Sequence, residues 1–227
     1  MKVLDFQAVK AIAAGTPDSE LIRWVDEALR EKPGYTLPPK IHISQQDGDY
    51  YNVMPCIYER GNLAMVKMIG RHGHENRIMD LFRQDPDVHF VLCDTYEEVI
   101  GGSDLVISAI TKVTENFVTD EYFKEGCTVI PICTMGFQNC DLFFDRVFTD
   151  EIEQIRGFKY FDHFAPVTTN VADVLNGAAP GRTDNVQRIL VYNYGIAIHD
   201  LVFAANIYGR AAVPDTPYHY CREKHFI

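Results

Sequence analysis

The feature that most limits the fold is an alternation of helix-like segments with short apolar runs, which begins near residue 74. Three of the runs are VHFVLC, DLVISAI and CTVIPIC, and helix-like segments such as HENRIMDLFRQ and TYEEVIGG precede or separate them. Runs that are apolar on both faces are typical of parallel strands covered by helices on both sides. The pattern therefore predicts an α/β fold with a parallel sheet, to which a strand near RVFTD also contributes.

The first seventy residues predict a different arrangement. A helix is expected after Thr16 as its cap and Pro17, because LIRWVDEAL carries one apolar stripe. Three strand-like segments follow, KIHI, YNVMPCIY and NLAMVKMI, and turns separate them. They predict a small antiparallel sheet. Near the C-terminus, GIAIHDLVFAANIYGRA predicts a long helix that can bury against two layers.

Composition excludes several classes of function. The 227 residues contain no run of about 18 apolar residues and no signal-like start, so a cytoplasmic protein without membrane contact is expected. The formal charge of −11 argues against nucleic acid as a partner. The six cysteines show no C-x2-C spacing and lie mostly in apolar runs, which indicates buried free thiols and no metal site.

Several residues are candidates for chemistry. Lys67 interrupts the apolar run AMVKMIG, so it either points outward or enters a site. GFQNCD follows CTVIPIC, where it either forms the ligand crevice at the end of a parallel strand or merely connects. Gly195 lets the chain approach a ligand closely before the long helix, whose N-terminus favours an anion or a polar atom.

Three further side chains have ordinary explanations. Arg182 lies in the turn GAAPGR, where a surface arginine is common. His199 and Asp200 lie in the first turn of the long helix, and a buried pair between them is one alternative. A helix-start aspartate and a hydrogen-bonded histidine are the commoner alternative. The chain contains no G-x-G-x-x-G, and GRHG at residues 70–73 matches that pattern weakly.

The order of motifs resembles the ornithine cyclodeaminase/mu-crystallin family. The resemblance rests on TYEEVIGGSDLVISAIT, FKEGCTVIPICTMGFQNCDL and the stretch from DVLNGAAPGR through IAIHDLVFAANIYGRA. Upstream, LPPKIHI, YNVMPCIY and MVKMIG resemble the family's substrate-side sheet. The resemblance implies an incomplete Rossmann-like parallel sheet plus a small antiparallel substrate and dimerisation sheet. It further implies a substrate-side domain of residues 1–72 with 187–227, and a truncated nucleotide domain of residues 73–186.

The resemblance also implies a function, that of an NAD(P)-linked oxidoreductase or deaminase. It implies NAD or NADP as cofactor, a small amino, imino or keto acid as substrate, and a homodimer. Lys67 is then the catalytic candidate, and it binds the substrate together with Lys40 and Met54. The residues implied to line the nicotinamide are Met135, Gly136, Asn139, Asn193 and Gly195.

The sequence departs from the family's pattern between MVKMIGRH and HENRIMDLF. There the family's glycine-rich loop, a substrate arginine and the first Rossmann strand have no counterpart. The catalytic aspartate of the cyclodeaminase branch falls near Met135, and the family's serine before the long helix is Asn193. The alternative is therefore a catalytically inactive, truncated paralogue that acts as a binding or interaction protein.

Overall fold

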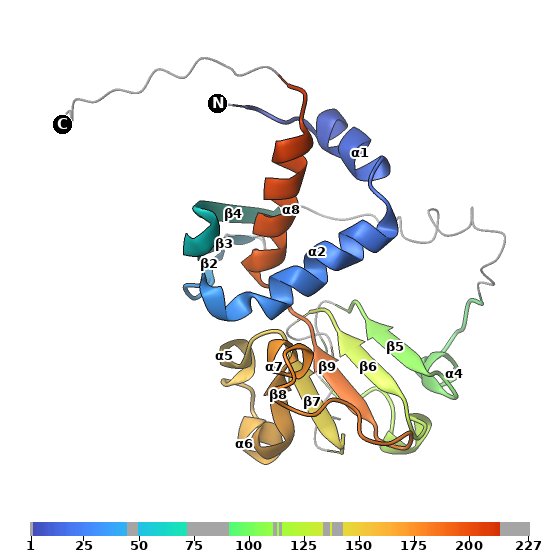
Figure 1. Ribbon diagram of the computed structural model, residues 1–227. Helices are drawn as coiled ribbons and strands as arrows, with labels where there is room; N and C mark the ends of the chain where they lie inside the picture. The colour runs from blue at the N-terminus through green and yellow to red at the C-terminus, as the bar shows by residue number, and fades with distance from the viewer. Residues whose placement is uncertain are drawn as a thin grey trace.

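The computed structural model contains two sheets joined by long helices (Figure 1). It describes residues 2–44, 50–71, 91–110, 113, 115–133, 137 and 143–213. Within these, the helices are α1 (Phe6–Ala14), α2 (Asp18–Arg30), α4 (Tyr96–Ile100), α5 (Ile152–Ile155), α6 (Phe161–Phe164), α7 (Val171–Leu175) and α8 (Ala197–Arg210). Short 3-10 turns are η1 (Lys32–Gly34), η3 (Glu59–Gly61), η4 (Asp120–Tyr122) and η6 (Ala165–Val167).

The antiparallel sheet is built around one long strand. β3 (Tyr50–Tyr58) pairs along its length with β4 (Leu63–Arg71), and on its other side with β1 (Tyr35–Thr36) and β2 (Ile41–Ser44). Met54 and Cys56 of β3 pack with Ile198 and Leu201 of α8, and all four are buried. α2 lies across α8 on the side away from the sheet (Figure 1).

The parallel sheet has the strand order β5–β6–β9–β7–β8. Its strands are β5 (Leu105–Ser108), β6 (Thr128–Pro131), β7 (Arg146–Thr149), β8 (Thr168–Asn170) and β9 (Ile189–Tyr192). The predicted pairing of VISAI with VIPIC is confirmed, because β5 and β6 are adjacent and parallel. β9 lies between β6 and β7, so residues 189–192, which the predicted boundary gave to the substrate-side domain, belong to this sheet.

One expectation about this sheet is not met by the described part of a predicted strand, and another is wrong. Val91 and Leu92 of the run VHFVLC lie in irregular chain and are 69% and 75% exposed; the rest of the run before them lies outside the described residues. The expected cover on both faces also fails at β5, where Val106 is buried but Leu105 and Ile107 are 53% and 60% exposed. An apolar run becomes a buried strand only where a neighbouring layer covers it.

Helix boundaries differ in detail from the expected ones. Thr16 does not cap α2; its hydroxyl donates to the Ile12 carbonyl and so ends α1, a helix that the sequence pattern had not separated. TDEYFKEG, a third helix-like segment of the sequence, forms only the 3-10 turn η4 in the structure. HENRIMDLFRQ lies outside the described residues. Cys56 and Cys127 are buried free thiols, as predicted.

Candidate active-site cleft

A cleft of about 520 Å³ opens between the two sheets. One wall comes from the segment before β2 and from β3, the other from α5 and the residue before it, and the start of α8 completes the lining. The lining residues are Leu37, Pro38, Pro39, Lys40, Met54, Pro55, Glu151, Glu153, Gln154, Ile196 and Ala197. A mostly apolar cleft between two layers with a few charged groups is the usual form of a small-molecule site.

Two of the predicted substrate residues line this cleft. Lys40 is exposed and follows Pro38 and Pro39, whose fixed φ angles hold the segment extended before β2. Met54 is 8% exposed and reaches the cleft from β3. The structure therefore brings Lys40 and Met54 together.

Lys67 lies beside the cleft and points inward. It sits opposite Met54 in the β3–β4 register, and residues paired across strands share a face, which here is the face covered by α8. Its Nζ donates to both carboxylate oxygens of Asp200, at 2.7 and 2.8 Å. The outward alternative for Lys67 is therefore wrong, although its catalytic role stays a prediction.

Cys56 and His199 lie close to this ion pair, and burial shifts the pKa of each. Burial raises the pKa of the Cys56 thiol to about 11, and the Asp200 charge adds to the shift. Burial lowers the pKa of His199, with Asp200 opposing and Lys67 adding to that shift. His199 Nδ1 is buried without a hydrogen-bond partner in the part of the chain that the structure describes, so the expected hydrogen bond is not found at this nitrogen.

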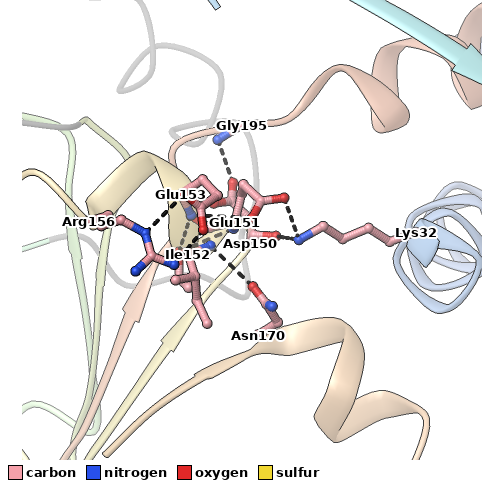
Figure 2. A network of polar contacts seen from close by, with 9 residues as sticks. Lys32, Asp150, Glu151, Ile152, Glu153, Arg156, Asn170 and Gly195 are labelled. Carbon is pink, nitrogen blue, oxygen red and sulfur yellow. Dashed lines mark hydrogen bonds and ion pairs between the residues drawn. The ribbon is translucent and has the colours of Figure 1, made fainter. Parts of the chain in front are cut away.

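The turn between β9 and α8 forms the third element of the site. Gly195 has φ +77°, a conformation that favours glycine, and its N–H donates to Asp150 Oδ2 at 2.8 Å (Figure 2). Ile196 and Ala197, which follow it, line the cleft, whereas Asn193 and Gly195 are not among the lining residues. Asn193 lies at the end of β9, where its N–H donates to the Pro131 carbonyl of β6 at 3.1 Å.

Asp150 is one of the polar residues beside the cleft that the sequence analysis did not single out. It follows β7 directly, is 4% exposed, and burial raises its pKa to about 6 against the pull of the Gly195 hydrogen bond and of Lys32. Its other oxygen, Oδ1, is buried and has no hydrogen-bond partner among the described residues. The sequence signal was the acidic pair Asp150–Glu151 at the carboxyl end of a parallel strand, where ligand crevices form.

Lys32 joins η1 to the wall of the cleft that contains Glu151. This side chain of η1 lies 3.0 Å from Glu151 Oε2 and donates to the backbone carbonyl of Asp150 (Figure 2). Glu153, further along that wall, is paired with Arg156 at 2.5 Å. No sequence pattern pointed to Lys32, because its partners lie more than a hundred residues away.

Arg182 has a structural place away from the cleft. Its guanidinium donates to Thr128 Oγ1 at 2.9 Å and to the Gln187 carbonyl, at the amino end of β6. The described residues contain no group of three or more His, Cys, Asp or Glu side chains placed to hold a metal ion. No helix in that part of the chain is long and apolar enough to span a membrane.

The described residues fit a dinucleotide only in part. Met135, Gly136 and Asn139, predicted to contact the nicotinamide, lie outside them. The apolar Ile196 and Ala197 suit a nicotinamide ring, but the Gly195 amide already has a partner in Asp150. A dinucleotide phosphate group needs a glycine-rich turn with free amides, and the sequence has no G-x-G-x-x-G.

Comparison with known proteins shows which family and which relatives this chain is similar to. A family profile described as "Ornithine cyclodeaminase/mu-crystallin family" matches residues 74–214. Nodulation efficiency protein NfeD of Rhizobium meliloti is 29% identical over 119 residues, which are 49% of this chain and 37% of that protein. The match therefore spans little more than a third of that relative's length.

Solved structures share the fold over nearly the whole chain. Thermococcus litoralis Delta(1)-pyrroline-2-carboxylate reductase, solved with NADH and L-proline, aligns with TM-score 0.75 at 13% identity, covering 93% of this chain and 97% of its own. An archaeal alanine dehydrogenase dimer with bound NAD aligns with TM-score 0.67 at 14% identity, covering 90% and 93%. Because the profile also matches more than half of the chain, the chain belongs to the ornithine cyclodeaminase/mu-crystallin family.

Proposed function

We propose that the cleft binds the carboxylate of a small amino, imino or keto acid, and that the chain acts on this acid as an NAD(P)-linked oxidoreductase or deaminase. The observation that carries the proposal is the charge of the cleft. Among its lining residues, Glu151 faces Lys32 and Glu153 faces Arg156, whereas Lys40 has no ion-pair partner in the described ranges. A small anion would supply the missing charge.

Lys67 is the proposed catalytic residue beside this carboxylate. It shares a face of the sheet with Met54, and Met54 lines the cleft. Asp200 holds the ammonium group in place and offsets its charge. Lys67 would then contact the substrate from the apolar side, with Lys40 at the open side. That arrangement suits an acid whose nitrogen and carboxylate must be held separately.

The proposed cofactor is NAD or NADP. Two structural relatives were solved with NADH or NAD bound, and one of them also holds L-proline. When bound, a nicotinamide accepts or supplies hydride. The proposed contacts in this chain are Met135, Gly136, Asn139, Asn193 and Gly195. The sequence has no G-x-G-x-x-G to hold the phosphate groups of the dinucleotide.

The second candidate function is a binding or interaction protein without catalysis. The missing glycine-rich loop favours it, and so does the place of β5 as the outer strand of the parallel sheet in the described chain. In dinucleotide-binding sheets the phosphate loop follows a central strand. Both candidates share the carboxylate site and differ only in the nucleotide.

We also propose a homodimer formed through the antiparallel sheet. The face of this sheet that α8 does not cover carries five large apolar residues, each between 41% and 69% exposed to solvent. They are Ile41, Ile43, Ile57, Val66 and Met68. The β2–β3–β4 register places Ile41 and Met68 on one line across the sheet. A contiguous apolar face of this kind marks an interaction surface, and a second copy offers the same face in return.

A nucleotide titration tests which function is present. NADH and NADPH are added to the protein while nicotinamide fluorescence is followed, in the presence and absence of L-proline and L-alanine. The enzyme proposal predicts a saturable change and turnover with at least one acid. The binding-protein candidate predicts no saturable change with either nucleotide.

A further inference from the structure

Asp150 and Asp145 form a matched pair at the two ends of β7. Asp150 Oδ2 accepts the Gly195 N–H after β9 at 2.8 Å, and Asp145 Oδ2 accepts the Arg188 N–H before β9 at 2.7 Å. Both carboxyls thus tie β7 to the flanks of the same neighbouring strand. Asp145 is exposed to solvent, whereas Asp150 is 4% exposed and carries a buried oxygen without a hydrogen-bond partner among the described residues.

The tie made by Asp150 leads directly to the cleft. Gly195 adopts the left-handed turn, and the next two residues, Ile196 and Ala197, line the cleft. Three residues further along α8, Asp200 accepts a hydrogen bond from Lys67. The Asp150 N–H donates to the Tyr192 carbonyl of β9 at 3.1 Å, so its backbone is fixed on the sheet. A change in the Asp150 side chain therefore acts on the entry to α8 and not on the strand itself.

We propose that Asp150 is a positioning residue for the cleft wall: its neutral acid keeps the Gly195 turn closed, and ionisation releases that turn. A buried carboxylate with one bare oxygen is costly, and opening the turn lets the charge hydrate. Burial disfavours the ion and outweighs the groups that favour it, which are the Gly195 N–H, the ammonium of Lys32 and the backbone N–H of Glu151. The charge of the Glu151 side chain adds to the effect of burial.

Hydrogen exchange measures this directly, without any ligand. Amide protection of the segment 193–199 is compared with that of α2 across pH, after correction for the intrinsic exchange rate. With a pKa of about 6 in the closed turn and the ordinary 3.8 in the open one, protection of the segment should rise about tenfold from about pH 7.5 to about pH 5. α2 should not follow that rise.

Two substitutions distinguish the effect of the Asp150 carboxyl on amide protection from that of the Asp145 carboxyl. Asp150→Asn mimics the neutral acid, so segment 193–199 should be protected at every pH, about a hundredfold above wild type at about pH 7.5. Asp145→Asn removes the exposed carboxyl at the other end of β7 and should keep the wild-type profile. His199 in α8 acts with the opposite sign, because its burial disfavours proton uptake.

The outcomes bear on Asp150 alone. A flat wild-type profile overturns the proposal even if Asp150→Asn fails to fold, and so does a profile that α2 shares. A pH dependence that persists in a folded Asp150→Asn variant also overturns it. Since no nucleotide or acid is present, none of these results bears on the proposed function.

Discussion

Lys67 and Asp200 lie 133 residues apart in the chain and are joined by two hydrogen bonds of 2.7 and 2.8 Å. The pair joins β4 to α8 and so fixes the helix that completes the cleft. The two side chains are 30% and 36% exposed, so water reaches them and screens the attraction. The pair therefore matters more for the position of α8 than for the total stability of the fold.

Replacing Lys67 should separate function from stability. Lys67→Met should abolish turnover or acid binding while lowering the free energy of unfolding by only about 1 kcal/mol, since Met keeps most of the volume. Urea unfolding followed by circular dichroism measures the stability, and calorimetry measures the binding. A double-mutant cycle with Asp200→Asn should give a coupling of about 1 kcal/mol or less. Full activity in Lys67→Met would show that Lys67 is not catalytic.

Asp150 should make stability fall as pH rises. Its folded pKa of about 6 lies above the ordinary 3.8, so the folded state binds the proton more tightly than the unfolded chain. Protonated Asp150 makes its full contribution to the free energy of unfolding below about pH 4. That contribution, roughly 3 kcal/mol in all, is lost as pH rises through about 6. Urea midpoints of wild type and Asp150→Asn should therefore diverge between about pH 4 and 7. Parallel curves would contradict this.

Gly195 should tolerate substitution poorly. Its φ of +77° is strained for any residue with a Cβ, so Gly195→Ala should cost about 1 kcal/mol or more in unfolding free energy. Gly209→Ala is the matched control: Gly209 lies within α8, and no atom is within 4 Å of an added Cβ. That variant should be neutral or stabilised by up to about 1 kcal/mol. Equal effects of the two substitutions would show that the turn carries no constraint.

The dimer proposal predicts two different responses to a new charge. Val66→Asp places a carboxylate in the exposed face of the antiparallel sheet and should give a monomer by sedimentation at micromolar concentration. Ile107→Asp places one on the exposed face of β5, where a similar fraction of the side chain is exposed, and should leave the dimer intact. A monomeric wild type, or a dimer that survives Val66→Asp, would contradict the proposed interface.

Sequence periodicity predicted the sheets well because each strand carries its own signal. DLVISAI and CTVIPIC became β5 and β6, and YNVMPCIY and NLAMVKMI became β3 and β4. VHFVLC carried the same signal, yet Val91 and Leu92 lie exposed, since a strand also needs a neighbour that the local pattern does not encode.

The site could be predicted only in part. Lys67 stood out because a cation within an apolar strand is unusual, and Lys40 was predicted only through the resemblance to the family. The contacts of Lys32 with Asp150 and Glu151 join segments more than a hundred residues apart, and no local spacing announces such a pair. The burial of Asp150 likewise depends on the whole fold, so RVFTDE alone gave no sign of a carboxyl with a raised pKa.

The most direct test of the central claim is a calorimetric titration of L-proline and L-alanine, with NADH present, into wild type, Lys40→Met and Lys10→Met. Lys10 is an exposed lysine of α1 and does not line the cleft. We predict saturable binding of at least one acid to wild type and Lys10→Met, and a Kd about ten to a hundred times weaker for Lys40→Met. Equal affinity in all three proteins, or no binding by the wild type, would contradict a carboxylate site in this cleft.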